Sequence, residues 1–491
     1  MIENLIIGFE HLIQIKNLAM IPIGVIVGVM LGAIPGLGSS FAITIMIPMT
    51  YWMSPEQALI FLTNIGSASV FGGSLPAILL HIPGTGGSTA TTWEGYSMTK
   101  KGEANRAVGI SLFASSLGGF LGSVIVILFA PMLALYGLKF SYPEVFLIAI
   151  LAVSLIASAS GNLVKGFFAG FLGLLIASVG TDPISAIPRF TFHIYGLYDG
   201  VHYVVVLIGL FGISEIFFLV RKNQIVANEK DISSDVTDIL EGSKDVFRNF
   251  KLFIQSSFLG TILGAVPGIG PAITNFMAYN LAVSYSKTPK KFGTGVPEGI
   301  VATESCNTAT QSGALIPTCT LGIPGSGMTA ALLAGFMLHG LAPGPQLFIQ
   351  NPEGIYSILI AFSIGSLLII PLVFGFIKYI VKIVYIQVNL LIPIILLMAV
   401  IGAFGINNST IDIVIMIIFG ILGYYMRLYN YPISALVLPI ILGPKIEEGF
   451  RKGLMLSNGD YLIFFTRPIC IMLWIIILLS ITAPFFIRKL K

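Results

Sequence analysis

Charge is what this sequence has least of: Asp, Glu, Lys and Arg make up 10% of its 491 residues, whereas soluble globular proteins carry about 25%. Apolar residues make up 56%, which is more than a soluble fold can hide while it keeps a polar surface. We therefore expect an all-α polytopic membrane protein. Since a full span needs about 20 residues, the recurring apolar segments predict about 11–14 membrane segments, some of them broken or re-entrant helices.

Cysteine is also rare, and enzyme motifs are missing. Cys306, Cys319 and Cys470 have no metal-ligand spacing, so they are best explained as small packing residues. The sequence has no His-Glu-x-x-His motif, no Walker loop and no paired catalytic acids. Lys and Arg lie in short loops, which gives no sign of a nucleic-acid partner. We expect no catalytic residues and no cofactor, and the chain has no nucleotide-binding motif through which it could use a nucleotide as an energy source.

One hydrophilic stretch divides the chain almost in the middle and is predicted to be a solvent-exposed linker. The first residues mix acidic, basic and apolar side chains, as interfacial helices do. The predicted organisation is an amphipathic N-terminal segment (1–19), a first membrane repeat (20–220), the charged linker (221–251), a second membrane repeat (252–450), and a C-terminal membrane helix with a basic tail (451–491).

Two glycine-rich motifs occur twice, in the same order. The segment Gly32–Gly38 (GAIPGLG) recurs 232 residues later as Gly264–Gly270 (GAVPGIG). The segment Ile82–Gly86 (IPGTG) recurs 241 residues later as Ile323–Gly327 (IPGSG). A single match of this kind is weak evidence, but two ordered matches indicate an internal duplication.

The placement of lysine and arginine predicts that the two repeats are inverted. After the first motif, the loop Tyr51–Glu56 has no Lys or Arg, whereas Tyr285–Lys291 has three lysines. After the second motif the bias reverses, because Gly95–Arg106 has three basic residues and Gly340–Glu353 has none. Basic residues favour cytoplasmic loops, so equivalent loops are expected on opposite sides of the membrane.

Each motif contains a Pro-Gly pair that breaks a helix. Broken backbone survives inside a membrane only where it is buried in protein or lines a polar cavity. A helix that starts after a break points unpaired amides and a positive dipole end at the cavity, which suits an anion. The alternative is that the small residues only allow close helix packing. The candidate substrate-binding residues are Gly36, Gly38, Ser39, Ser40, Pro83, Gly84, Thr85, Ser88, Gly268, Gly270, Asn275, Asn307, Thr308, Pro324, Gly325, Ser326 and Gly327.

Glu304 is an ionisable residue between the two motifs of the second half, and Thr63 occupies the equivalent first-half position. Such residues inside membrane segments are functional candidates. Glu304 could coordinate a cation or carry a proton, or it could cap a helix or lie near an interface. We take Glu304, Asn64, Ser67 and Thr310 as candidates for binding a cation or a proton, and whether the chain binds a metal is open.

The same residues resemble the large permease subunit of the tripartite tricarboxylate transporters, the TctA family. The matching stretches run in the family's order over most of the chain: Gly32–Gly38, Gly73–Arg106, Gly180–Phe192, Gly295–Gly327 and Gly423–Pro444. Some positions depart from the family pattern, namely His81 where Asn is common, Gly86-Gly87 in place of a Pro-Ala pair, and Cys306 and Thr308 beside Asn307. These departures lie near the predicted site.

The resemblance implies a multi-pass permease of the cell inner membrane that imports organic anions, typically di- or tricarboxylates, with sodium or proton coupling. It also implies a small membrane subunit and a periplasmic solute-binding protein as partners. The predicted function is therefore ion-coupled secondary transport by alternating access. The alternative is a membrane-embedded enzyme or an assembly scaffold without transport activity.

Overall fold

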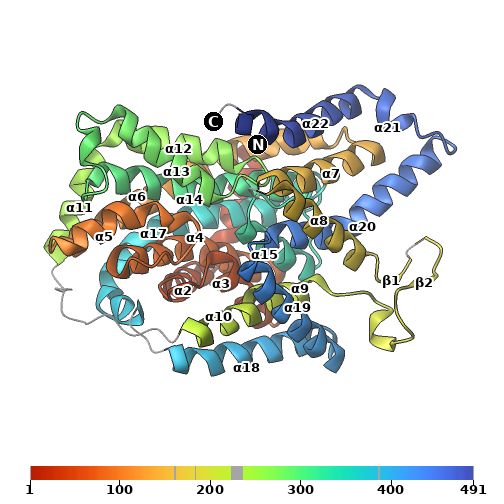
Figure 1. The fold of residues 1–491 in the computed structure, drawn as a ribbon, viewed down its shortest axis with the longest axis horizontal. Helices are drawn as coiled ribbons and strands as arrows, with labels where there is room; N and C mark the ends of the chain where they lie inside the picture. Colours follow the sequence, from red (N-terminus) through yellow and green to blue (C-terminus); the bar gives the residue numbers. More distant parts are fainter. Residues whose placement is uncertain (1, 160–161, 183, 223–235, 385–387, 490–491) are drawn as a thin grey trace.

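The computed structural model describes residues 2–159, 162–182, 184–222, 236–384 and 388–489. Residues 223–235 of the predicted linker and the last two residues of the basic tail lie outside this range. The described chain is almost entirely helical, with α4, α6 and α14 running through the middle of the molecule (Figure 1).

The first part of the chain reaches from the N-terminus to the predicted linker. Its elements are α1 (Ile2–Ile13), α2 (Ile15–Gly32), α3 (Ser39–Met46), η1 (Ile47–Thr50), α4 (Pro55–Leu80), η2 (Gly87–Thr89), α5 (Thr91–Lys100), α6 (Ala104–Gly137), α7 (Tyr142–Ala159), α8 (Leu163–Ala177), β1 (Gly180–Thr181), β2 (Pro188–Arg189), η3 (Tyr195–Leu197), α9 (Tyr203–Leu207), the π-helical turn η4 (Ile208–Ile213) and α10 (Ser214–Lys222).

The second part repeats several of these elements. It comprises α11 (Val236–Arg248), α12 (Phe250–Gly264), α13 (Pro271–Tyr285), η6 (Pro289–Lys291), α14 (Pro297–Leu321), α15 (Gly327–Leu338), α16 (Leu347–Gln350), α17 (Pro352–Val384), α18 (Val388–Asn407), α19 (Thr410–Leu428), α20 (Ile433–Leu456), α21 (Ile463–Thr466) and α22 (Pro468–Lys489).

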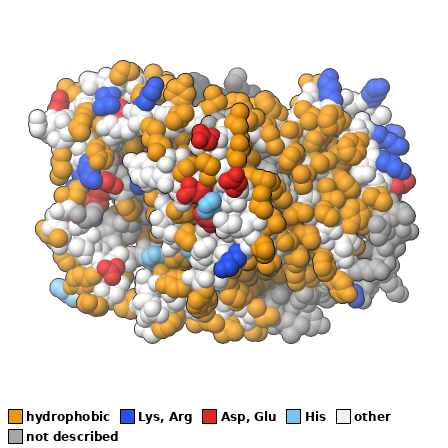
Figure 2. Space-filling view, turned by 180° about the vertical axis from the view of Figure 1, so that it is seen from behind, with side chains coloured by type: hydrophobic (Ala, Val, Ile, Leu, Met, Phe, Trp, Pro, Cys, Tyr) orange, Lys and Arg blue, Asp and Glu red, His pale blue; other side chains and the backbone are white. Residues whose placement is uncertain are grey.

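Within the described residues, six helical segments are long and apolar enough to cross a membrane: Ile15–Gly32, Pro55–Leu80, Ala104–Gly137, Tyr203–Val220, Pro352–Ile377 and Thr410–Leu428. Seven shorter apolar helices accompany them, as expected if some spans are broken. Hydrophobic side chains cover most of the face in Figure 2, where charged side chains form small clusters. The prediction of an all-α polytopic membrane protein is confirmed.

The two halves pack their helices in the same way. Gly32 of α2 lies so close to α4 that an added Cβ atom would overlap the carbonyl oxygen of Ser69. Gly264 of α12 lies equally close to the carbonyl oxygen of Thr310 on α14. Gly264 follows Gly32 by 232 residues and Thr310 follows Ser69 by 241, the same offsets that separate the motifs. The duplication seen in the sequence is therefore also present in the helix packing.

Each half also buries the central helix of the other. Helix α6 of the first half packs along α14 of the second, and α17 of the second half packs along α4 of the first. Gly118 of α6 meets Ser305 of α14, and Gly365 of α17 meets Asn64 of α4. Through these reciprocal contacts the two halves are interlocked.

Helix α11 makes up most of the described part of the charged linker, and it packs against α6. Ile239 and Asp245 of α11 are buried. Asp245 accepts hydrogen bonds from Nε and Nη2 of Arg106, at 2.8 and 3.1 Å. This part of the linker is therefore held on the membrane domain, where the sequence suggested exposure to solvent.

A short hairpin, β1 and β2, is the only sheet among the described residues, and ion pairs fasten it to α20. Gly180 pairs with Arg189 and Thr181 with Pro188, antiparallel. Arg189 donates two hydrogen bonds to the carboxylate of Glu447 on α20, at 2.8 and 3.0 Å. This bidentate pair fixes the hairpin beside α20.

Candidate functional site

The first Pro-Gly break of each half forms the turn that the sequence predicts. Gly36 and Gly268 have φ angles of 87° and 90°, a left-handed conformation that favours glycine. A new helix follows each turn: α3 has Gly38 as its N-cap and α13 has Gly270. The backbone therefore breaks and restarts at equivalent points of the two halves.

The second break of each half follows a left-handed helix cap. The C-cap residue after α4 is His81, with φ 58°, and the C-cap residue after α14 is Gly322, with φ 67°. Histidine is one of the few residues other than glycine that are enriched in this conformation, together with Asn and Asp, so His81 is compatible with this cap.

The hydroxyl groups after the second breaks cap the next helical turns. The amide of Ser88 donates to Thr85 Oγ1 at 3.2 Å, and the amide of Thr85 donates to Ser88 Oγ at 3.1 Å. Ser326 and Thr329 form the equivalent capping box at the start of α15. These candidate hydroxyls thus hold the loops in shape.

The four breaks lie against one another. A Cβ atom added at Gly86 would lie 3.6 Å from Cβ of Ala272, in the first turn of α13. The amide of Gly268 donates to the carbonyl oxygen of Gly325 at 3.4 Å. A Cβ atom added at Gly327 would lie 2.7 Å from Oγ of Ser40, in the first turn of α3. The breaks of both halves therefore form one continuous region at the centre of the molecule.

Two buried asparagines of the second half meet the first-half loop at Gly87, forming what we call the asparagine site (Gly87, Asn275 and Asn307). Asn275 Nδ2 donates to the carbonyl oxygen of Gly87 at 2.5 Å, and a Cβ atom at Gly87 would overlap the carboxamide of Asn307. Both asparagines are 1% exposed. Asn275 Oδ1 and Asn307 Nδ2 have no hydrogen-bond partner among the described residues. Buried polar atoms are nearly always paired, so these two are candidates for contacting a ligand.

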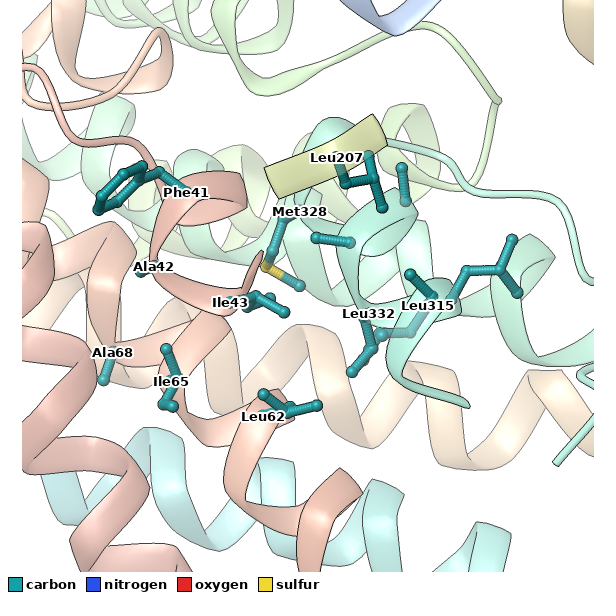
Figure 3. Close-up of a cluster of buried hydrophobic side chains, with 14 of the residues drawn as sticks. Phe41, Ala42, Ile43, Leu62, Ile65, Ala68, Leu207, Leu315, Met328 and Leu332 are labelled. Carbon is teal, nitrogen blue, oxygen red and sulfur yellow. The ribbon is translucent and has the colours of Figure 1, made fainter. Parts of the chain in front are cut away.

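The equivalent place in the other half is apolar. The residues that correspond to Gly87, Asn275 and Asn307 by the repeat offsets are Met328, Ile43 and Gly66, which we call the counterpart site. A Cβ atom added at Gly66 would lie 3.0 Å from both Ile43 Cδ1 and Met328 Sδ. Figure 3 shows Met328 and Ile43 pointing toward each other among buried hydrophobic side chains. The duplication therefore provides two equivalent places, of which one is polar.

Two further candidates carry unpaired buried hydroxyl groups. Ser39 Oγ and Thr308 Oγ1 have no hydrogen-bond partner among the described residues. Thr308 turns its methyl group toward Gly119 of α6, and Ser39 begins α3. Both are adjacent in the chain to residues at the junction of the breaks, Asn307 and Ser40.

Glu304 lies one helical turn before Asn307 on α14 and is 0% exposed. Its carboxylate accepts four hydrogen bonds from hydroxyl groups of α4, α5 and α6: Ser74 (2.7 Å), Thr91 (2.5 Å), Ser111 (3.0 Å) and Ser115 (2.8 Å). We call these five residues the Glu304 cluster. Of the two structural explanations that the sequence left open, neither a helix cap nor an interface position describes this residue.

The other coupling-ion candidates lie elsewhere. Ser67 Oγ is 3.1 Å from Ser366 Oγ on α17, and Asn64 packs against the same helix. Thr310 Oγ1 is 2.9 Å from Thr274 Oγ1 on α13. None of the three is hydrogen-bonded to Glu304 among the described contacts, so the four candidates do not form one ion site in this structure.

The sequence reasoning missed the four hydroxyl groups around Glu304. The available signal was on α6, where Ser111 and Ser115 are separated by one helical turn in an apolar span. Polar residues at that spacing share one face of a helix, but only the fold brings that face to α14.

Comparison with known proteins decides the family. The model of the tripartite tricarboxylate transporter TctA family matches residues 18–438. The chain belongs to this family. Residues 18–438 of this TctA protein contain both glycine motifs of each half, the asparagine site and the Glu304 cluster.

Two relatives of the TctA chain come from Agrobacterium vitis. An uncharacterized 52.8 kDa protein in the TAR-I ttuC′ 3′ region is 34% identical over 471 residues, which cover 96% of this chain and 93% of the relative. An uncharacterized protein in the TAR-II ttuC′ 3′ region is 36% identical over 210 residues, which cover 43% of this chain and 87% of the relative. No solved structure matches the chain.

Family membership confirms the resemblance drawn from the motifs. The TctA chain is a multi-pass membrane protein and a component of a tripartite tricarboxylate transporter, which works with other subunits. The family is one of transporter components, so the alternative of a membrane-embedded enzyme is excluded.

Proposed function

We propose that the chain is the permease of an ion-coupled secondary transporter that imports di- or tricarboxylates across the cell inner membrane. In this proposal it works by alternating access between two inverted repeats, with a small membrane subunit and a periplasmic solute-binding protein as partners. The observation that carries the proposal is the meeting of the four helix breaks beside the asparagine site.

The asparagine site has the chemistry that a carboxylate needs. Asn307 Nδ2 is an unpaired N–H donor, and Gly86 places the neighbouring loop against the first turn of α13. The start of α13 presents the positive end of the helix dipole, whereas Pro271 has no amide hydrogen and the amides of Ile273 and Thr274 bond to the carbonyl oxygen of Gly270. Amide donors and a helix start together bind an anion without a buried Lys or Arg, which would be costly to keep there between transport steps.

An inverted arrangement is supported by the loops at the two ends of α4. This helix has 26 residues, so it is about 39 Å long at 1.5 Å per residue and exceeds the hydrocarbon thickness of about 30 Å. Near its start, Thr50 is hydrogen-bonded to His339 at 2.8 Å. At its end, the hydroxyl group of Thr99 donates to the carbonyl oxygen of Ile78 at 2.8 Å. The loops after the two motifs therefore gather at opposite ends of α4.

The lysine-rich loops adjoin each other at the end of α4. Ser97 Oγ donates to the carbonyl oxygen of Gly293 at 3.1 Å, which brings the segment with Lys100 beside the segment with Lys290. These segments follow different motifs in their repeats. Their common location, with the basic-residue bias toward the cytoplasm, favours inverted repeats.

Cysteine labelling tests this topology. We expect Lys100→Cys and Lys290→Cys to react with a membrane-impermeant maleimide only after cells are opened, and Trp52→Cys, which is 84% exposed, to react in intact cells whose outer membrane has been permeabilised. The three native cysteines are buried and should give little background. Labelling of position 100 and position 290 from opposite sides would contradict the inverted arrangement.

A binding screen tests the substrate class. We expect the purified full-length chain in nanodiscs to bind citrate or succinate, measured by calorimetry, and not the uncharged triamide and diamide analogues. The screen is run with sodium and with choline as the cation. Absence of binding to every di- and tricarboxylate under both conditions would contradict a permease site and favour an assembly scaffold.

A further inference from the structure

The Glu304 cluster is a complete set of hydrogen bonds around one buried carboxyl group. Three hydroxyl groups reach Oε2, and Thr91 reaches Oε1. All four hydroxyl-bearing residues are 0% exposed. The O···O distances of 2.5–3.0 Å are those of ordinary O–H···O hydrogen bonds, so each gap is spanned by one hydrogen atom.

No cation compensates the carboxyl group among the described ion pairs, since none of them includes Glu304. The helices around Glu304 carry other titratable side chains that are not exposed, and these side chains contact residues other than Glu304. Glu94 of α5 bonds to Tyr279 of α13 at 2.7 Å and to three loop amides, and Arg106 of α6 pairs with Asp245 of α11.

The remaining such groups lie at other positions on the same helices. They are Glu56, which bonds to His11 beside the start of α4; Tyr96 of α5, whose ring packs on His81; Glu103, which pairs with Arg106 at the start of α6; and Glu298, Cys306 and Cys319 on α14 itself. An ionised carboxylate without a cation is costly to bury, and the four hydroxyl donors offset part of that cost while no anion is bound at the asparagine site.

The cluster is not a requirement of the fold, because the equivalent place in the other half is apolar. The repeat offsets map Glu304 to Thr63, Ser74 to Leu315 and Thr91 to Leu332. Thr63 donates only to backbone carbonyl oxygens of its own helix. Figure 3 shows Leu315 and Leu332 as members of the same cluster of buried hydrophobic side chains. The same packing of helices thus accepts either polar or apolar side chains at this place. The polar side chains occur only where the asparagine site also lies.

The Glu304 cluster and the asparagine site share their structural elements. Glu304 and Asn307 are three residues apart on α14, a spacing that places them on one face of the helix. The opposing segment, η2 followed by α5, contacts both: Gly87 meets Asn307, and Thr91, the first residue of α5, bonds to Glu304. Any movement of this segment that follows anion binding at Gly87 would therefore also change the hydrogen bonds of Glu304.

We propose that Glu304 is the proton-binding site of the transporter and takes up one proton when a carboxylate binds at the asparagine site. This inference rests on the proposed function and assigns its coupling ion and residue. The proton, taken from water, forms an O–H bond at Oε1, and the same bond breaks when the proton is returned to water on the other side. Neutral Glu304 then donates to Thr91 Oγ1, whose hydrogen turns toward Thr303 Oγ1 at 3.0 Å.

The hydrogen bonds around Thr91 and Thr303 can be oriented so that Thr91 accepts a hydrogen bond from a neutral Glu304. Thr303 Oγ1 donates to the carbonyl oxygen of Gly299 at 2.9 Å, so it can accept from Thr91, and the chain of donors from Glu304 ends on a backbone acceptor. Protonation also removes a negative charge one helical turn from a bound anion, and like charges at this range repel strongly in a low-dielectric interior. Anion affinity is therefore expected to fall as pH rises.

Infrared spectroscopy tests the protonation directly. We expect the full-length protein in nanodiscs to gain a carboxylic-acid C=O band when citrate or succinate is added near neutral pH, and Glu304→Gln to lack it. Calorimetry on the same samples should give a carboxylate affinity that falls tenfold or more between pH 6 and pH 8 in the wild type and stays constant in Glu304→Gln. Thr63→Val, the change at the equivalent position, should keep both the band and the pH dependence.

Three outcomes would overturn the inference. One is carboxylate binding by the wild type with no pH dependence and no C=O band. Another is a sodium requirement at fixed pH that Glu304→Gln removes, which would make the cluster a sodium site. The third is a band that persists in Glu304→Gln. Should Glu304→Gln fail to fold, Ser115→Ala replaces it, and it should shift the pH at which the wild-type band appears. Failure of every carboxylate to bind would instead overturn the proposed function.

Discussion

Leucine in place of Asn307 or Asn275 is expected to weaken carboxylate binding at least about tenfold, because hydrogen bonds to charged groups contribute roughly 1.5–3 kcal/mol each. Leucine branches at the same carbon as asparagine and is larger, and it offers no hydrogen-bond donor. Asn307 supplies the unpaired Nδ2 hydrogens, and Asn275 holds the Gly87 loop through its 2.5 Å hydrogen bond. The two losses differ in origin: Asn307→Leu removes a contact to the anion, and Asn275→Leu releases the loop. Calorimetry with citrate or succinate on the purified protein measures both.

The duplication offers a matched control for this experiment. Ile43→Val at the counterpart site changes a buried residue that occupies the same position relative to α4 as Asn275 does relative to α14. It should cost about 0.5–1.5 kcal/mol of stability, as core Ile→Val changes do, and leave the affinity for carboxylates unchanged. Equal loss of affinity in Ile43→Val and Asn307→Leu would contradict the proposal that the anion binds at the asparagine site and not at the counterpart site.

Valine at Gly84 or Gly325 is expected to reduce uptake of a labelled carboxylate to background. A Cβ atom at Gly84 would lie 2.6 Å from both the Cα and the carbonyl oxygen of Gly73, and one at Gly325 would lie 2.9 Å from Cα of Ala314. Backbone atoms cannot turn aside as a side chain does, so the loop after the break must move as a whole. Because the four breaks contact one another, displacement of one loop also displaces the asparagine site. Whole-cell uptake with the complete transporter measures the effect.

Gly375→Val is the control, because a Cβ atom at this position of α17 has nothing within 4 Å. It introduces the same side chain into a membrane helix without touching a break, so uptake should stay near the wild-type rate. Membrane content and gel-filtration profile should match the wild type in all three variants. Normal uptake by both Gly84→Val and Gly325→Val would show that the breaks do not shape the transport site.

Much of the fold could be predicted because the length and apolar composition of a segment are enough to identify a membrane helix. The Pro-Gly breaks were predictable for a local reason: proline removes an amide donor, and Gly36 and Gly268 adopt φ angles that other residues avoid. Glu304 was singled out because an acid in an apolar stretch is costly wherever it lies. The candidate list also contained every member of the asparagine site except Gly87.

Contacts between distant segments could not be predicted. The hydroxyl groups of Ser74, Thr91 and Ser111 reach Glu304 across 193 to 230 residues of sequence, and no local pattern encodes such pairings. The same limit applies to the difference between the asparagine site, which is polar, and the counterpart site, which is apolar. Aligning the repeats pairs Asn275 with Ile43. Only the packing reveals that Asn275 faces the Gly87 loop and that Ile43 faces Met328. The packing of helix α11 against α6 could not be predicted either, because the charged residues of this segment are also typical of a solvent-exposed linker.

The interlocking of the halves bears on how the chain is made. Ser67 of α4 meets Ser366 of α17, 299 residues later in the sequence. At a synthesis rate of about 5–20 residues per second, α17 emerges roughly 15–60 s after α4. During that interval the first half lacks the helix that covers Asn64 and Ser67, and lipid offers these side chains no hydrogen bonds. The newly inserted first half is therefore an intermediate that must be shielded, by a transient partner or by alternative pairing, until the second half arrives.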